Sequence, residues 1–378
     1  MDASAAPPIG QVGVVTVDGM LRLSLCRGPE IDIPLIALRD RCGCAACRHP
    51  SGQRLLDPAT IPNDLAGADL RVDGDTIRMT WMPEQHESAY AISDLFAPTS
   101  ARRTPTLWDG GSERDLPIAR HSAIIANDAA GRGALLRWLE GVQTMGCGLL
   151  HDVPTIDGEV TRVAELFGHV RETNYGRWFD VRSVVDPSNL ANTSLGLAAH
   201  TDNPYRDPVP TMQLLHCLES TAAGGDNMLV DGWRVANEVR ELNPTGFDLL
   251  VRRDVTFAYR DGSTDLTAHA PLVELGGNGM VRSVRFNPRS MQQPSMPSAE
   301  LAVWYDAYLL FARLLADPRF QIRFRLDPGD LFIVDNRRVL HGRTAFGAAS
   351  GSRHLQGCYA DIDALHSTIS VLQRQAPA

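Results

Sequence analysis

The sequence lacks an excess of basic residues, a long apolar run and an internal repeat. It has 36 Lys and Arg against 45 Asp and Glu, a net charge of −9, whereas a nucleic-acid-binding face must be basic to neutralise phosphates. No stretch approaches the roughly 20 apolar residues of a membrane helix, and residues 1–10 do not resemble an export signal. We therefore expect a cytoplasmic protein that binds a small molecule, with neither nucleic acid nor membrane as partner.

Cysteine is also scarce, with seven residues in the chain, and three of them lie close together. An odd number of cysteines without an export signal argues against a disulfide framework. Cys42, Cys44 and Cys47 instead indicate thiolates that bind a metal. A closed structural zinc site takes four ligands, often as three cysteines and one histidine. His86 and the nearby His49 are the candidates for the fourth ligand.

The length of 378 residues exceeds what one hydrophobic core usually supports, so we expect two domains. Residues 1–100 are predicted to form a small β-rich domain, and residues 101–378 a larger one, with a Pro-, Thr-, Ser- and Gly-rich connection over 97–115. The larger domain shows helical spacing of apolar residues over 130–145, 159–170 and 299–316. Its other segments are short β-like runs, at 211–217, 227–230, 255–259, 281–286, 321–324, 330–334 and 353–360. Many short strands with a few covering helices predict a double-stranded β-helix, or jelly roll.

The His-x-Asp pattern at His200 and Asp202, with His341 far downstream, predicts an iron site. Side chains two residues apart on an extended segment point to the same face, where they can bind one ion. Two imidazoles and one carboxylate on one face of an iron leave coordination positions open for catalysis. We therefore expect these three residues to be the catalytic metal ligands.

Several stretches around this pattern match one family. They are His200-Thr201-Asp202, and the segments 214–217, 224–226, 335–343 and 353–361. Together they resemble the gamma-butyrobetaine hydroxylase and trimethyllysine dioxygenase family of Fe(II)/2-oxoglutarate oxygenases. The resemblance implies Fe(II), O2 and 2-oxoglutarate as the reactive components, stimulation by ascorbate, and a homodimer. It also implies a structural zinc closed by His86, because segment 38–47 matches the family's cysteine pattern.

The resemblance assigns the distal carboxylate of 2-oxoglutarate to Arg353, because a planar guanidinium binds a carboxylate through paired charge-assisted bonds. Asn227 and Leu214 are expected at the same cosubstrate site. Asn227 stands where the family usually has a hydroxyl residue, and its amide can still donate a hydrogen bond. Three further polar residues near these motifs are expected to be core or supporting positions, namely His216, His354 and Cys358.

A trimethylammonium group cannot donate hydrogen bonds, so proteins hold it against aromatic faces. By resemblance the aromatic cage consists of Tyr175, Phe179 and Tyr359, with Trp178 nearby. The remaining expected substrate contacts are polar, namely Asn189, Asn192, Asn203 and Arg289.

Two departures from the family bear on the substrate. Asn192 replaces a cage tyrosine, and Pro288, beside Arg289, replaces an asparagine that holds the substrate carboxylate. Because arginine binds an anion of higher charge better than an amide does, we favour 2-(trimethylammonio)ethylphosphonate, the substrate of one relative. Gamma-butyrobetaine, hydroxylated to L-carnitine, is the alternative, and a jelly-roll binding protein without chemistry is a remote one.

Overall fold

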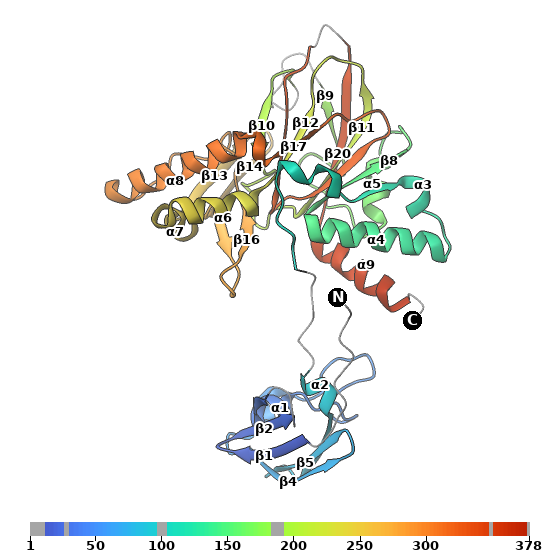
Figure 1. The fold of residues 1–378 in the computed structure, drawn as a ribbon, viewed down its shortest axis with the longest axis vertical. Coiled ribbons are helices and arrows are strands. Elements are labelled where there is room, and N and C mark those ends of the chain that lie inside the picture. The colour runs from blue at the N-terminus through green and yellow to red at the C-terminus, as the bar shows by residue number, and fades with distance from the viewer. Residues whose placement is uncertain (1–11, 26–29, 97–103, 183–192, 348–350, 376–378) are drawn as a thin grey trace. The chain divides into compact units, whose positions relative to one another are not determined.

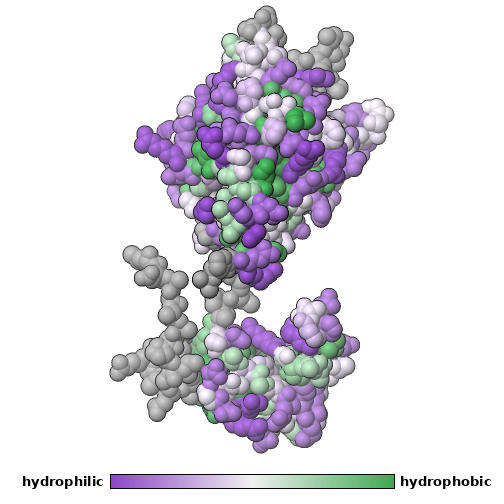
Figure 2. Space-filling model, turned by 90° about the vertical axis from the view of Figure 1, so that its right-hand side faces the viewer, coloured by the Kyte–Doolittle hydropathy of each residue, from purple (hydrophilic) through white to green (hydrophobic). Residues whose placement is uncertain are grey.

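The computed structural model describes residues 12–25, 30–96, 104–182, 193–347 and 351–375. The chain divides into two compact units, Met1–Arg102 and Arg103–Ala378 (Figure 1). On the face drawn in Figure 2, hydrophilic residues cover most of the surface of each unit, with smaller hydrophobic areas between them. Across the described ranges, no helix combines the length and apolar character that a membrane crossing requires.

The first unit contains two three-stranded antiparallel sheets, β1-β2-β3 and β4-β5-β6. Alternate residues of β2 and β5 point inward, as the two-residue period of a strand requires, and Leu21, Leu23, Ile77 and Trp81 are fully buried. The elements are β1 Val12–Val17, β2 Met20–Leu25, β3 Glu30–Pro34, α1 Leu35–Asp40, η1 Pro58–Thr60, β4 Ala66–Asp73, β5 Thr76–Met82, β6 His86–Ala91 and α2 Ile92–Phe96.

The second unit is built on two facing sheets, a six-stranded one of order β7-β8-β18-β11-β20-β9 and a four-stranded one of order β10-β19-β12-β17. Their strands are β7 Ile118–Arg120, β8 Cys147–His151, β9 Phe179–Arg182, β10 Leu197–His200, β11 Met212–Ser220, β12 Asn227–Asp231, β17 Gln321–Phe324, β18 Leu331–Asp335, β19 Val339–Arg343 and β20 Arg353–Ala360. This is the double-sheet jelly roll that the sequence predicts.

Helices and two small hairpins cover the outer faces of these sheets. The hairpins are β13 Val255–Arg260 with β14 Asp265–Ala270, and β15 Val273–Leu275 with β16 Val281–Val284. The helices are η2 Gly110–Asp115, α3 His121–Ile124, α4 Ala129–Met145, α5 Glu159–Glu165, α6 Gly232–Leu242, α7 Pro244–Arg252, α8 Ser298–Ala316, η4 Pro318–Phe320 and α9 Ile362–Gln375. The helix expected over 159–170 therefore ends earlier, at Glu165.

Three buried layers follow from the alternation of side chains along the strands. One apolar cluster lies between the sheets and includes Leu215 and Leu229. A second joins the outer face of the six-stranded sheet to α4, α5 and α9, and a third joins the four-stranded sheet to α6, α7 and α8 (Figure 1). Each sheet is packed against helices on its outer face, so polar side chains that point between the sheets project from a well-supported backbone.

Candidate active site

The pairing of β10 with β19 brings together the three residues of the expected iron site. His200 and His341 are direct cross-strand partners, and their ring centroids are 4.6 Å apart. Asp202 follows β10, and its Oδ1 lies 3.3 Å from Nε2 of His200. One nitrogen or oxygen atom from each residue lies within 4.8 Å of the other two, so the three side chains can bind one ion together.

Hydrogen bonds to residues outside the triad fix the orientation of two of its side chains, His200 and Asp202. Nδ1 of His200 lies 2.9 Å from the carbonyl oxygen of Ala198, so the ring turns Nε2 toward Asp202. Oδ2 of Asp202 accepts from Gln213 at 2.7 Å and from the Tyr359 hydroxyl at 2.8 Å. Only Oδ1 of the carboxylate therefore faces the imidazoles, which suits a carboxylate that binds a metal through one oxygen.

The ionisation states suit a divalent metal. Burial raises the pKa of Asp202, but the hydrogen bond from His200 and the charge of His341 outweigh it and hold that pKa well below its usual range. Burial, with a contribution from His200, lowers the pKa of His341 to about 3. At neutral pH the site therefore offers a carboxylate anion and an imidazole with its lone pair free.

A cavity of about 80 Å³ adjoins the triad between the two sheets. His341 lines it together with Arg353 and Asn227, and Nη2 of Arg353 donates to Oδ1 of Asn227 at 3.1 Å. Both residues are buried, with exposed fractions of 8% and 4%. The structure thus brings two of the expected cosubstrate residues to the triad.

A second arginine, Arg343, lines the same cavity, and sequence reasoning missed it. Burial and the neighbouring Arg353 lower the pKa of Arg343 to about 10, so its side chain remains a cation at neutral pH. The position of Arg343 in β19 would have predicted it, because residues two apart on a strand share a face and His341 points into the site.

Leu214, also expected at the cosubstrate site, lies elsewhere. Its side chain is fully buried in the cluster that joins the sheet to the helices. The alternation of β11 turns its neighbours Gln213 and Leu215 toward the cavity instead. Sequence reasoning therefore chose the wrong face of this strand.

A larger cavity of about 500 Å³ also adjoins the triad and shares His200 and Asp202 with the smaller one. Tyr175, Phe179 and Tyr359 line it, as the resemblance implies, and the Phe179 and Tyr359 rings are 5.2 Å apart. Sequence reasoning missed Tyr205 and Tyr259, whose rings stack at 4.9 Å. These five aromatic residues form the wall that we call the aromatic cage.

Hydrogen bonds hold the cage in place. The Tyr175 and Tyr205 hydroxyls are 2.8 Å apart, and the Tyr259 hydroxyl donates to Asp261 at 2.8 Å. Asp261 also lines the cavity, and its pKa is lowered by hydrogen bonds from the Ser263 backbone and from Tyr259. The cage therefore has a carboxylate at its edge, which suits a cationic ligand.

The same cavity contains an arginine and three asparagines, Asn174, Asn203 and Asn287. Arg289 lines it, and its Nε lies 3.3 Å from Oδ1 of Asn287. The Asn287 amide nitrogen donates one hydrogen bond to the carbonyl of Thr201 at 3.2 Å. Asn203 is 3% exposed, and both polar atoms of its side chain are buried without a hydrogen-bond partner. Arg289 and Asn203 thus have hydrogen-bonding capacity available for a ligand.

Other expected residues lie apart from the cavity or outside the described residues. Asn189 and Asn192 fall within 183–192, outside the described ranges. Trp178 is 41% exposed. The expected core positions are His216 and Cys358, which are buried, and His354, which pairs with Asp180 at 2.7 Å.

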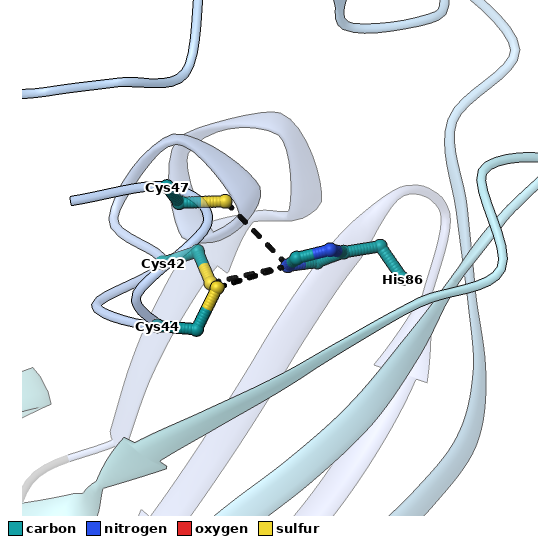
Figure 3. A group of neighbouring side chains, drawn as sticks. All are labelled: Cys42, Cys44, Cys47 and His86. Atoms are coloured by element: carbon teal, nitrogen blue, oxygen red, sulfur yellow. Dashed lines mark hydrogen bonds between the residues drawn. The ribbon is translucent and has the colours of Figure 1, made fainter.

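The cysteine cluster lies in the first unit, on the loop that follows α1, and faces His86 at the start of β6 (Figure 3). Nε2 of His86 is 3.4 Å from Sγ of Cys42, 3.6 Å from Cys44 and 3.5 Å from Cys47. His49 contacts Ser51 instead and does not belong to this group.

Donors surround two of the sulfur atoms. The Ser88 hydroxyl donates to Sγ of Cys42 at 3.0 Å, and Arg39 donates to Sγ of Cys47 at 3.3 Å. Arg39 is 3% exposed and pairs with Glu84 at 2.7 Å. Such donors stabilise negatively charged thiolates and orient metal ligands.

Comparison with known proteins gives matches to both units. Residues 123–359 match the family described as taurine catabolism dioxygenase TauD, TfdA family, and residues 15–96 match the description gamma-butyrobetaine hydroxylase-like, N-terminal. The chain is 35% identical over 348 residues to a gamma-butyrobetaine dioxygenase of Pseudomonas sp. (strain AK-1), covering 89% of each chain.

Two further relatives match over similar lengths. The gamma-butyrobetaine dioxygenase of Homo sapiens is 29% identical over 360 residues, covering 90% of this chain and 91% of that one. A trimethyllysine dioxygenase of Meyerozyma guilliermondii is 27% identical over 360 residues, covering 89% of each. These matches confirm the resemblance carried by the motifs, and the chain belongs to the TauD, TfdA family of dioxygenases, among its gamma-butyrobetaine hydroxylase-like members.

Proposed function

We propose that this protein is an Fe(II)/2-oxoglutarate-dependent dioxygenase that hydroxylates an unactivated C–H bond of a small trimethylammonium zwitterion. The observation that carries the proposal is that His200 and Asp202 line two cavities of different character. The small cavity offers arginine for a carboxylate, and the large one offers an aromatic cage for a cation. One metal therefore has a place for a cosubstrate and a place for a substrate beside it.

The residues fit Fe(II). Two imidazoles and one carboxylate oxygen converge, and the low pKa values of Asp202 and His341 keep both available as ligands. Fe(II), when bound, supplies O2 activation coupled to the decarboxylation of 2-oxoglutarate to succinate. We assign His200, Asp202 and His341 as its ligands.

The protein positions the two organic molecules. Arg353 binds the distal carboxylate of 2-oxoglutarate, with Asn227 holding its guanidinium. Tyr359 has two roles, because its hydroxyl donates to Asp202 while its ring contributes to the cage. The substrate cation is thereby held at a fixed distance from the metal ligands, which selects one carbon for reaction.

The cage suits a trimethylammonium group. Five aromatic side chains surround the space, and the Asp261 carboxylate adds a negative charge at its edge. A quaternary ammonium loses little by leaving water for such a site, because it donates no hydrogen bonds. Tyr205 and Tyr259 provide aromatic surface in addition to the expected residues.

For the anionic end we propose a phosphonate, and 2-(trimethylammonio)ethylphosphonate as the substrate. Asn287 accepts from Arg289 and donates one N–H to Thr201, so the charged group available to an anion is the Arg289 guanidinium. A dianionic phosphonate gains more from a guanidinium than a carboxylate does. Asn203, with its unpartnered amide, can donate to a further oxygen.

Gamma-butyrobetaine is the second candidate. The 35% identity to a protein named gamma-butyrobetaine dioxygenase favours it. It carries the same cation and a carboxylate in place of the phosphonate. The two candidates therefore differ in the group that Arg289 would contact.

We further propose that residues 1–100 form a zinc-binding domain and residues 101–378 the catalytic domain. Bonds of about 2.3 Å to sulfur and 2.0–2.1 Å to nitrogen, at a tetrahedral angle, place sulfur and nitrogen roughly 3.5 Å apart. The three Sγ to Nε2 distances, 3.4, 3.6 and 3.5 Å, fit that geometry. Four protein ligands leave no open position, so this zinc is structural. We also propose that the protein is a homodimer, as the resemblance implies.

Product analysis on a panel of zwitterions tests the proposal. The panel contains trimethylammonium phosphonates and carboxylates, with matching dimethylamines and neutral alcohols as controls. We expect succinate and a hydroxylated product with trimethylammonium zwitterions, and the highest kcat/KM with the phosphonate. Efficient turnover of gamma-butyrobetaine alone would assign the second candidate, and an absence of hydroxylated product throughout would contradict the proposal.

A further inference from the structure

Arg343 has an unusual environment. It is 4% exposed, and one terminal nitrogen, Nη2, donates to the backbone carbonyl oxygens of Thr193 and Leu195. The other two nitrogens, Nε and Nη1, are buried and have no hydrogen-bond partner. A buried, unpartnered donor of a charged group costs free energy, so these two nitrogens indicate that a ligand is to be bound.

The surroundings of Arg343 show what kind of ligand this is. It lines the cavity of about 80 Å³ together with Arg353. The Phe346 ring centroid lies 5.1 Å from Cζ of Arg343 and 5.8 Å from Cζ of Arg353. The charged groups that act on Arg343 are themselves cations, Arg353 and Arg289. Two guanidiniums at one cavity, without a carboxylate paired to either in the described part of the chain, require an anion from outside.

Close backbone packing makes room for this arrangement. A Cβ atom at Gly342 would lie 2.5 Å from the carbonyl oxygen of Leu197, so β10 approaches β19 between His341 and Arg343. Gly225 has a φ of +77°, and a Cβ there would lie 3.1 Å from Nε of Arg353. Both arginines thus lie beside closely packed glycines, where a larger residue would force neighbouring atoms to shift.

We propose that Arg343 is a second binding residue for the distal carboxylate of the 2-oxo acid cosubstrate and acts together with Arg353. The inference rests on the proposed function and deepens it. A carboxylate has two oxygens with about four acceptor positions, so one guanidinium leaves acceptors free for another. Two guanidiniums make a distal carboxylate obligatory and select 2-oxoglutarate over 2-oxo acids that lack one.

Arg343 also holds the backbone at Thr193 and Leu195, so a substitution could act through structure alone. Two ligands distinguish these effects. 2-Oxobutyrate has the same 2-oxo acid end as 2-oxoglutarate but lacks the distal carboxylate. Loss of structure would weaken the binding of both, whereas loss of a carboxylate contact weakens only that of 2-oxoglutarate.

The experiment is calorimetric titration of the full-length, zinc-containing protein loaded with Mn(II), which binds ligand without turnover. Both 2-oxo acids are titrated into the wild type, Arg343→Gln, Arg343→Lys and Arg353→Gln. Arg323→Gln is the matched control, because Arg323 is an exposed arginine on β17 of the same sheet.

We expect Arg343→Gln to raise the Kd for 2-oxoglutarate about ten-fold or more, as loss of a charge-assisted contact does. The Kd for 2-oxobutyrate stays within about two-fold, Arg343→Lys recovers part of the loss, and Arg323→Gln resembles the wild type. Unchanged 2-oxoglutarate binding in Arg343→Gln, or an equal loss for both ligands, would overturn the inference. A wild type that binds no 2-oxoglutarate would contradict the proposed function itself.

Discussion

Two residues of the triad, His200 and Asp202, are held by hydrogen bonds to residues outside it, so the groups that would bind the metal are distinct from the groups that orient them. Ala198 orients His200, and Gln213 and Tyr359 occupy one oxygen of Asp202. The metal ligands themselves are therefore replaceable without removing a large part of the core. Substitutions here should alter function more than folding.

The first prediction concerns the metal ligands. His200→Ala or His341→Ala removes one of three ligands, so each should lose bound Fe(II) and turnover while the melting temperature falls little. Iron content, succinate release and thermal unfolding are measured together. His354→Ala is the control, because that histidine pairs with Asp180 outside the triad. Full activity in either triad variant would contradict the assignment.

The second prediction concerns the substrate anion. Arg289→Asn removes the cation that lines the substrate cavity, and a charge-assisted contact contributes roughly 1.5–3 kcal/mol. We expect kcat/KM for the phosphonate to fall about ten-fold or more, with a smaller change for gamma-butyrobetaine. Arg282→Asn, which alters an exposed arginine paired with Glu274, should change neither. Equal losses for both substrates would show that Arg289 does not discriminate between the anions.

Among the residues of the site, the sequence predicts those that stand in a short local motif. His200, Asp202 and the cysteines stand in short motifs with definite spacing. Tyr259 stands in no such motif, because only the folding of the β13 hairpin brings it to the cavity. Tyr205, three residues after Asp202, could have been inferred from its proximity to the triad.

At the scale of elements, the position of the site depends on how β10 joins the rest of its sheet. Asn336, in the turn between β18 and β19, accepts from the Asp202 backbone NH at 2.7 Å and donates to the Asp202 carbonyl at 2.9 Å. It also donates to the carbonyl of Pro210 at 2.9 Å. This side chain is 2% exposed, and it connects the end of β10 to the turn before β19, the strand that carries His341.

The third prediction follows from this connection. Asn336→Ala leaves buried backbone groups unpaired, so the free energy of unfolding should fall by about 1–3 kcal/mol for each group left without a partner. Fe(II) should also bind more weakly, because Asp202 is less well positioned. Chemical denaturation and metal titration measure the two effects. Asn278→Ala, in an exposed turn, is the control. Unchanged stability and metal affinity would show that the connection is dispensable.

The sequence predicts strands better than short helices at this scale. Short, nearly continuous apolar runs mark β11, β12 and β18, and the long α8 shows its helical period. The helices α6 and α7 were missed, although each begins with an N-cap signal: Asp231 accepts from the backbone NH of Trp233, and Asn243 accepts from that of Gly246. The extent of α5 was overestimated because Leu166 and Phe167 continue the apolar spacing after the helix ends.

For the whole molecule, we propose that the first unit holds a structural metal and the second a catalytic one. The cysteine cluster has four ligands and no open position, whereas the triad has three ligands beside two cavities. The length predicts two domains, and the cysteine and His-x-Asp motifs predict unlike metals in them. They contain no information on the homodimer, which depends on surface complementarity.

The fourth prediction tests this division. Cys44→Ser removes a zinc ligand, and because binding free energy at a structural zinc site is largely folding free energy, the first unit should lose zinc and melt at a lower temperature. The kcat at a temperature where the second unit remains folded should change little. Zinc content, thermal unfolding and succinate release are compared with those of His49→Ala, which should keep its zinc. A fully stable Cys44→Ser variant without activity would show that this metal is catalytic.

The most direct test of the central claim is visible absorption spectroscopy without oxygen. A 2-oxo acid that chelates Fe(II) produces a charge-transfer band that neither component produces alone. We predict that the wild type forms this band when both Fe(II) and 2-oxoglutarate are added, and that a trimethylammonium zwitterion perturbs it. We predict no band for His341→Ala. The absence of the band in the wild type, or its full presence in His341→Ala, would contradict the account.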